Sequence, residues 1–211
     1  MEVFRLIFSP IEVNTYILSD GSGKCAVIDC GCYSRDEFDR LARLIDSKKL
    51  VPELLLNTHC HLDHIFGNRM FLERYGTGTL CHIEEDVNRN DSVHIAELFG
   101  LEMETAPAPA DYIDDNSIVS FGITHLQAIL VPGHTAGSLA FYSEKDSIVF
   151  TGDALFAGSI GRTDLKGGNY NTLVAGIRNR LFSLPAGTIV YPGHGESTTI
   201  EAEINTNPYF T

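Results

Sequence analysis

Histidines and aspartates follow several apolar runs of this chain, at the point where each run ends. The largest group is Thr58-His59-Cys60-His61-Leu62-Asp63-His64, which follows the run 54–56. His134, Asp153 and His194 follow the runs 129–131, 148–150 and 189–191. Short apolar runs of this kind are typical of buried strands. Because ligand-binding crevices of α/β folds open at the carboxyl ends of strands, these distant side chains are predicted to meet in one place.

Composition is typical of a globular protein, because 44% of the 211 residues are hydrophobic and 20% are charged. A chain of this length can form one domain with a sizeable core, so we expect a single domain over residues 1–211. No run approaches the ~18 apolar residues of a membrane span, and Met1–Pro10 lacks the long apolar core of a secretory signal. We expect a cytoplasmic protein without a membrane partner.

The net charge of −13 disfavours a nucleic-acid partner, because such binding depends on lysines and arginines placed against phosphates. The five cysteines are odd in number and form no Cys-x-x-Cys pair, so reduced thiols are expected. Cys30 and Cys32 match no metal or redox motif. In an extended segment the Cys60 side chain points away from those of His59 and His61, which favours a packing role.

The hydrophobic pattern predicts two similar halves, each with strands followed by helices. The first half has expected strands at 3–8, 13–19, 24–29, 54–57 and 79–82, and helices at 34–49, 68–75 and 84–99. The second half has expected strands at 126–131, 138–142, 147–150 and 188–191, and helices at 170–182 and 199–204. The first three strands form an antiparallel meander, and 106–110 is an extended connector. A sandwich of two sheets flanked by helices accommodates both halves.

The tripeptide Pro-Gly-His occurs twice, at 132–134 and 192–194, each time after a predicted strand. Proline ends the ladder of hydrogen bonds, and glycine allows a tight turn that projects the histidine from the strand end. Imidazole and carboxylate are preferred ligands of zinc and similar metals. The candidate ligands are too many for one tetrahedral ion and suit two ions that share a carboxylate: His59, His61, Asp63, His64, His134, Asp153 and His194.

This constellation resembles the metallo-β-lactamase superfamily, in which a Thr-His-x-His-x-Asp-His loop, a later histidine, an aspartate and a final histidine build a two-metal site. The resemblance covers nearly the whole chain and implies an α/β fold, the four-layer αββα sandwich. It assigns His59, His61 and His134 to one ion and Asp63, His64 and His194 to the other. Asp153 would bridge the ions, and β-lactamases commonly carry cysteine there, which disfavours antibiotic hydrolysis.

The stretch from Thr151 to Asp164, Thr-Gly-Asp-Ala-Leu-Phe-Ala-Gly-Ser-Ile-Gly-Arg-Thr-Asp, and Tyr-Pro-Gly-His-Gly at 191–195 resemble the glyoxalase II branch. That branch continues into a helical carboxyl-terminal region that helps to hold glutathione, whereas this chain ends at Thr211. The resemblance therefore implies a short glyoxalase II-like hydrolase without a glutathione-binding domain. Its candidate substrate is a small-molecule thioester, S-D-lactoylglutathione or a related acyl-thioester.

We expect two divalent ions as cofactors, zinc before iron or manganese. Two such ions make hydroxide available near neutral pH, and we predict that this hydroxide attacks the thioester carbonyl while Asp63 orients it. A thiol leaves with a pKa of about 8.5, so no dedicated acid is required.

Other polar residues have more than one interpretation. In one interpretation Arg162 and Asp164 pair with each other and brace Asp153. In the other, Arg162 binds a carboxylate of the substrate. Asp29 orients a metal-bound histidine or is an ordinary turn residue. Tyr170 and Lys166 are candidates for the mouth of the site, and the sequence does not decide their place. The remaining histidines are expected to be structural or exposed: His82, His94 and His125.

Two alternatives to the hydrolase stay open. Persulfide dioxygenases share the fold and the Gly-Arg-Thr-Asp stretch but use one iron held by two histidines and a carboxylate. A zinc-binding interaction module is the other, although structural zinc sites are usually closed and rich in cysteine. The oligomeric state is left open.

Overall fold

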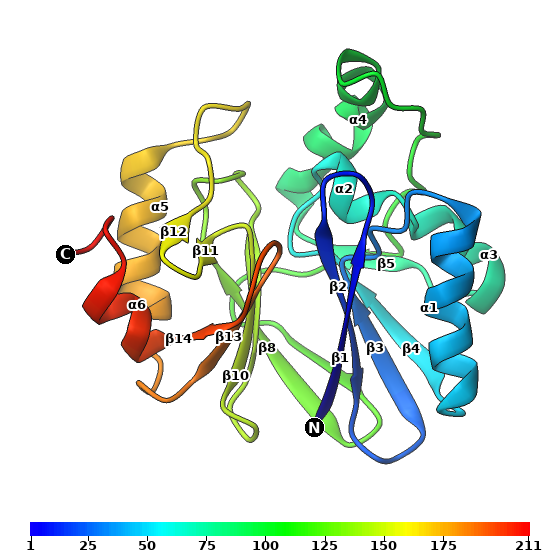
Figure 1. Cartoon of the computed structure of the whole chain (residues 1–211), viewed down its shortest axis with the longest axis horizontal. Helices are drawn as coiled ribbons and strands as arrows, with labels where there is room; N and C mark the ends of the chain where they lie inside the picture. Colours follow the sequence, from blue (N-terminus) through cyan, green and yellow to red (C-terminus); the bar gives the residue numbers. More distant parts are fainter.

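Two six-stranded sheets face each other at the centre of the computed structural model, which describes residues 1–211 (Figure 1). The first sheet contains, in spatial order, β1 (Glu2–Phe8), β2 (Val13–Ser19), β3 (Lys24–Ile28), β4 (Val51–Leu56), β5 (Thr79–Cys81) and β6 (Asp111–Tyr112). The second has the order β14-β13-β10-β9-β8-β7 and contains β7 (Ile118–Phe121), β8 (Thr124–Leu130), β9 (Leu139–Ser143), β10 (Ile148–Gly152), β13 (Ile189–Pro192) and β14 (Thr198–Thr199). A separate short ribbon pairs β11 (Leu155–Phe156) with β12 (Ser159–Ile160).

Helices cover the outer face of each sheet. The first sheet is covered by α1 (Arg35–Ser47) and α3 (Asn68–Tyr75), and the second by α5 (Tyr170–Gly176) with its π-helical continuation Ile177–Leu181 and by α6 (Ile200–Thr206) (Figure 1). The predicted αββα sandwich is therefore confirmed. A short α2 (Leu62–Ile65), a 3₁₀ turn (Ile83–Glu85) and α4 (Asp86–Leu98) lie at the upper end of the sheets in Figure 1.

Three apolar layers hold the sandwich together. Between the sheets, Tyr16, Leu56, Phe141 and Phe150 belong to one buried cluster. Two further clusters fill the space between each sheet and its helices. Helix α1 shows how the sequence directs this arrangement: its N-cap Ser34 accepts a hydrogen bond from a backbone N–H in the first turn, and its apolar stripe is buried.

Most predicted elements are present within a few residues of their expected bounds, including the antiparallel meander β1-β2-β3. The expected helix 84–99 begins as a 3₁₀ turn, and the expected helix 170–182 changes to π-helical pairing after Gly176. The edge strand β7 was not expected; its side chains alternate between exposed and buried as it pairs with β8. No helix combines the length and the apolar character needed to cross a bilayer.

Truncation of the core between the sheets should strongly destabilise the fold. Phe141 is fully buried there, so Phe141→Ala should lower the free energy of unfolding by about 3–5 kcal/mol through lost burial and a residual cavity. The matched control is Ile118→Ala on the edge strand β7, where the side chain is 60% exposed and the change should stay within about 0.5 kcal/mol. Urea unfolding measures both, and equal losses would contradict this assignment of the core.

Candidate metal centre

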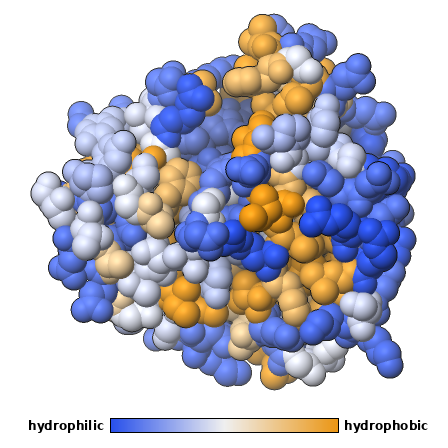
Figure 2. All heavy atoms as spheres, in the orientation of Figure 1, coloured by the Kyte–Doolittle hydropathy of each residue, from blue (hydrophilic) through white to orange (hydrophobic).

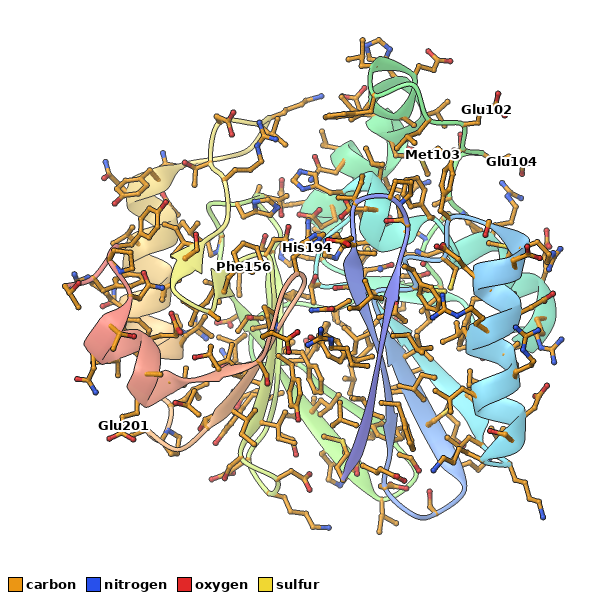
Figure 3. All side chains as sticks on the ribbon, viewed as in Figure 1. Glu102, Met103, Glu104, Phe156, His194 and Glu201 are labelled. Atoms are coloured by element: carbon orange, nitrogen blue, oxygen red, sulfur yellow. The ribbon has the colours of Figure 1, made fainter.

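The strand ends singled out in the sequence converge at one end of the sandwich. The Thr58–His64 loop follows β4 of the first sheet, while His134, Asp153 and His194 follow β8, β10 and β13 of the second. Strands β10 and β13 are parallel neighbours, which places Asp153 and His194 side by side. Figure 3 shows His194 between the upper ends of the two sheets. All seven candidate ligands predicted from the sequence therefore lie together.

A first group contains three imidazole nitrogens. Nε2 of His59 lies 3.1 Å from Nδ1 of His61 and 3.2 Å from Nε2 of His134. The third distance, from Nε2 of His134 to Nδ1 of His61, is 2.9 Å. These three nitrogens form a triangle that brings the loop after β4 into contact with the turn after β8.

A second group contains Asp63, His64 and His194, and Asp153 lies between the two groups. Oδ2 of Asp63 is 3.1 Å from Nε2 of His194 and 3.6 Å from Nε2 of His64. Oδ1 of Asp153 lies 3.4 Å from Nε2 of His64. Its Oδ2 is 3.6 Å from Nε2 of both His134 and His194, so the carboxylate faces both groups.

Hydrogen bonds behind the rings set the tautomers of these histidines. Nδ1 of His64 donates to Oδ2 of Asp29 at 2.9 Å, and Nδ1 of His134 donates to the carbonyl oxygen of Arg162 at 2.8 Å. Nδ1 of His194 donates to the carbonyl of Glu12 at 3.2 Å. With each Nδ1 carrying the proton, the Nε2 atoms of these rings present lone pairs to the centre.

The donor set fits a pair of divalent metal ions. The three inward nitrogens of the first group lie at hydrogen-bond distance from one another, and neutral rings cannot satisfy all three of these contacts in any combination of tautomers, which is unfavourable without a cation. Nε2 of His64 and Oδ1 of Asp153 are buried without any hydrogen-bond partner. Buried polar atoms are rarely left unpaired, and both of these point into the cluster. Neutral imidazole and carboxylate are the ligand types that zinc, iron and manganese accept.

The protonation states also suit metal binding. Burial and the neighbouring His134 lower the pKa of His61 to about 3, and burial lowers the pKa of His59 well below its ordinary value. Burial alone would raise the pKa of Asp153, but the neighbouring imidazoles, His64 first, outweigh it and lower that pKa. The imidazoles of His59 and His61 are therefore neutral and Asp153 is ionised near neutral pH, as metal ligands must be.

The carboxylates concentrate negative potential at His64. Burial lowers its pKa, but Asp63, Asp153 and Asp29 together raise it well above the ordinary value of an imidazole. The same potential attracts a metal cation to Nε2 in place of a proton.

The two Pro-Gly-His turns need glycine for different reasons. Gly133 has a φ of +126°, which side-chain-bearing residues rarely adopt, and a Cβ there would lie 2.4 Å from the backbone nitrogen of Leu173. A Cβ on Gly193 would instead lie 2.1 Å from Oδ1 of Asp153. The second turn therefore needs glycine because its backbone passes close to the carboxylate of Asp153.

Asp29 orients a candidate ligand, as one of the two interpretations predicted. Besides binding His64, its carboxylate accepts from the backbone N–H of Thr58 at 2.8 Å and from the Thr58 hydroxyl at 2.7 Å. Asp29 is buried at the end of β3 with a φ of +54°. It therefore links the Thr58–His64 loop after β4 to the end of the neighbouring strand β3.

The expected bracing of Asp153 by Arg162 and Asp164 is wrong. The guanidinium of Arg162 does pair with Asp164, through two hydrogen bonds of 2.8 Å, but both side chains are exposed and neither contacts Asp153. Arg162 acts instead through its backbone, since its carbonyl oxygen holds His134. Its side chain lines the cavity above the cluster.

A buried carboxylate that the sequence did not single out joins the two halves of the first group. Oε2 of Glu85 accepts from the backbone N–H of Cys60 at 2.8 Å, between His59 and His61. Its Oε1 accepts from the Thr135 hydroxyl at 2.6 Å, next to His134, and from the N–H of Gly137 at 3.0 Å. Glu85 is fully buried, and it positions both chain segments that carry the first group: the loop with His59 and His61, and the turn with His134.

A cavity of about 760 Å³ opens over the cluster. Its floor includes His61, Asp63, His134, Asp153 and His194, and Lys166, one candidate for the mouth, lies on its wall. Tyr170, the other candidate for the mouth, begins α5, is 49% exposed and is not among the residues that line this cavity.

The remaining predictions for single residues are confirmed. His82 caps the 3₁₀ turn before α4, while His94 and His125 are exposed, and none of the three lines the cavity. Cys60 is buried in a small apolar cluster with Ile65 and Cys81, in the packing role expected for it.

The family model of the metallo-β-lactamase superfamily matches residues 9–194. The chain belongs to this superfamily. It is therefore an enzyme of a metallo-hydrolase superfamily, with histidine and aspartate groups suited to divalent metal ions.

Its curated relatives include a probable metallo-hydrolase, YqgX of Bacillus subtilis, which is 34% identical over 97% of this chain and 95% of the relative. Hydroxyacylglutathione hydrolase GloC of Haemophilus influenzae is 33% identical over 99% of this chain and 98% of the relative.

Similar solved structures include BLEG-1 B3 metallo-β-lactamase, with 31% identity, full coverage of both chains and a TM-score of 0.90. TTHA1623 in a di-iron-bound form has 34% identity, coverage of 98% and 99% and a TM-score of 0.88. ETHE1 from Myxococcus xanthus has 27% identity, coverage of 99% and 84% and a TM-score of 0.81.

Removing the charge of Asp29 should weaken metal binding at the second group. Asp29→Asn keeps the shape and tolerates the positive φ, but it replaces the acceptor that orients His64 with a weaker one. We expect a 10–100-fold loss of metal affinity, measured by competition with a chelator. Asp36→Asn on the exposed face of α1 is the control, and unchanged affinity in Asp29→Asn would refute the orienting role.

Glu85→Gln should destabilise the first group. Every group that contacts the carboxylate is a donor, so an amide nitrogen in place of either oxygen faces another donor. We expect the free energy of unfolding to fall by about 1–3 kcal/mol and the affinity for the first-group metal to fall with it. Glu84→Gln on the exposed side of the same turn should change neither, and equal behaviour of the two variants would remove Glu85 from the centre.

Proposed function

We propose that this protein is a dinuclear metallo-hydrolase that cleaves acyl thioesters, in the manner of glyoxalase II. The observation that carries the proposal is the convergence of ring nitrogens that cannot all be hydrogen-bonded to one another. Two buried atoms without a partner, His64 Nε2 and Asp153 Oδ1, point into the same cluster below an open cavity. His59, His61 and His134 would hold one ion, and Asp63, His64 and His194 the other. Asp153 faces both groups and would bridge them.

Divalent ions held there supply Lewis acidity, which makes hydroxide available near neutral pH and polarises a carbonyl oxygen. Asp63 lies on the cavity floor with its carboxylate beside His194, so it can accept a proton from the attacking water and orient it. Its pKa is lowered, because the effects of His64 and His194 outweigh that of burial, so it is ionised near neutral pH. Asp63 is therefore our candidate catalytic residue.

The leaving group favours a thioester over an amide. Every histidine that lines the cavity belongs to the metal cluster, and Lys166 is paired with Asp91 at 3.3 Å. A thiolate, with a parent pKa of about 8.5, can leave without a proton donor, whereas an amine needs one. The GloC relative, a hydroxyacylglutathione hydrolase, supports the same substrate class.

Zinc is our first candidate for the metal, because four-coordinate sites of histidine and carboxylate suit it well. The di-iron form of a 34% identical structure makes iron the next candidate. Single-iron oxidation of a persulfide is the alternative reaction, and it needs only three protein ligands. The presence of both donor groups here favours the two-metal hydrolase.

Loss of Asp153 should abolish both metal retention and turnover. We expect Asp153→Ala to lose most bound metal and all hydrolysis of S-D-lactoylglutathione and S-acylglutathiones, as measured by elemental analysis and thiol release. His125→Ala is the control: the side chain is exposed on β8, and turnover should stay within about threefold of the parent. Full stoichiometry and activity in Asp153→Ala would overturn the bridging role.

The same metal-replete protein decides between reaction classes. Because one similar structure is a B3 metallo-β-lactamase, a β-lactam belongs in the substrate panel. Turnover of a β-lactam alone, or oxygen consumption with glutathione persulfide alone, would replace thioester hydrolysis as the function.

A further inference from the structure

We infer that the acyl group of the substrate is an apolar chain that packs against the carboxyl-terminal end of α4, rather than a small polar hydroxyacyl group. This inference rests on the proposed function and names the substrate class that the same site prefers.

The walls of the cavity are apolar on more than one side. Ile95, Leu98 and Phe99 form the wall contributed by the end of α4, which we call the α4 wall. Phe156 of β11 lies next to the cluster, with its ring centroid 6.3 Å from that of His194 (Figure 3). Ile11, between β1 and β2, adds a further apolar side chain. Apolar side chains therefore line the cavity both beside the candidate ligands and at the exposed end of α4.

The α4 wall exposes large apolar side chains that nothing in the fold covers. Leu98 is 70% and Phe99 62% exposed. Figure 2 shows hydrophobic atoms gathered over the upper end of the molecule, where α4 lies. Single exposed apolar residues are common on protein surfaces, but several that line one cavity indicate a binding site. The continuity of the wall with the candidate metal centre identifies the occupant as the bound substrate.

Each of the two cations that line the cavity has a carboxylate partner. Lys166 pairs with Asp91 of α4, and Arg162 pairs with Asp164. Both ion pairs are exposed and therefore weak, so these cations stay accessible to the charged arm of the thiol. The α4 wall and Phe156 offer no polar side chain to the hydroxyl of a hydroxyacyl group, while an apolar chain gains from burial there. The sulfur side of a biological thioester is a polar arm with amides or charges, so the acyl side must match the wall. The polar arm then lies toward the rim, near Asn88 and Lys166.

A chain-length series separates this inference from the proposed hydrolysis. Binding is measured by calorimetry with the metal-loaded protein and S-methyl-, S-butyl- and S-hexylglutathione, which cannot be hydrolysed. Each added methylene that is buried should tighten binding about fourfold until the chain reaches the rim. In parallel, kcat/KM for S-acylglutathiones of increasing length should rise similarly and exceed that for D-lactoylglutathione.

Phe99→Ser tests the α4 wall itself. Its affinity for S-hexylglutathione should fall roughly tenfold, while that for S-methylglutathione stays unchanged. The matched control is Ile123→Ser, which removes a 64% exposed side chain from the turn between β7 and β8, outside the cavity. Sedimentation of both variants checks whether Phe99 instead lies in contact with a second copy of the chain.

The outcomes of the two measurements are distinct. A chain-length dependence of binding that Phe99→Ser removes supports the apolar acyl site even where no thioester is hydrolysed, in which case only the proposed reaction fails. Binding that is absent or independent of chain length overturns the inference even where lactoylglutathione is hydrolysed. A change of oligomeric state in Phe99→Ser with an unchanged chain-length dependence would also overturn it.

Discussion

The crowding of buried ring nitrogens and carboxylate oxygens that cannot all be hydrogen-bonded is the constraint on which this structure depends. Imidazole nitrogens of His59, His61 and His134 meet within 2.9–3.2 Å, and buried atoms of His64 and Asp153 have no hydrogen-bond partner. Such an arrangement costs free energy in any protein unless cations occupy the centre. Metal binding therefore contributes to the stability of this region as well as to its chemistry, since ions that bind only the folded chain shift the folding equilibrium.

The cluster is rigid because each half of the chain holds ligands of the other half. Near the amino terminus, Asn14 donates from its backbone N–H to the carbonyl of Gly193 at 2.7 Å, and its side chain donates to the carbonyls on either side of the His194 turn. In the opposite direction, Leu139 of β9 donates to the carbonyl of Thr58 at 2.8 Å. Neither sheet alone could build the centre, so the site exists only where the two sheets pack together.

The ligands could be predicted from sequence because their signal is local: a polar side chain follows a short apolar run, and strand ends of one sheet share an edge. Apart from Asp29, the groups that orient these ligands could not be predicted. His134 and His194 are held by backbone carbonyls of Arg162 and Glu12, and a carbonyl has no sequence signature. Glu85 resembled any acidic residue at the start of a helix, and its burial depends on the packing of α4 against distant segments. Side-chain identity likewise suggested that Arg162 braces Asp153, whereas its backbone carbonyl binds His134.

Specificity must come from groups other than the ligands. Structures and relatives more than 30% identical to this chain include a hydroxyacylglutathione hydrolase and a B3 metallo-β-lactamase, so fold and superfamily leave the substrate undecided. The centre can activate water against many carbonyl compounds, because its chemistry is independent of what lies beyond the scissile bond. What distinguishes one substrate from another is contact along the cavity, and here the contact surface beside the centre is formed by Phe156 and the α4 wall. Glu85, which positions the first group of ligands, is the residue immediately before α4, so this helix connects the metal geometry before its start with the proposed substrate contact at its end.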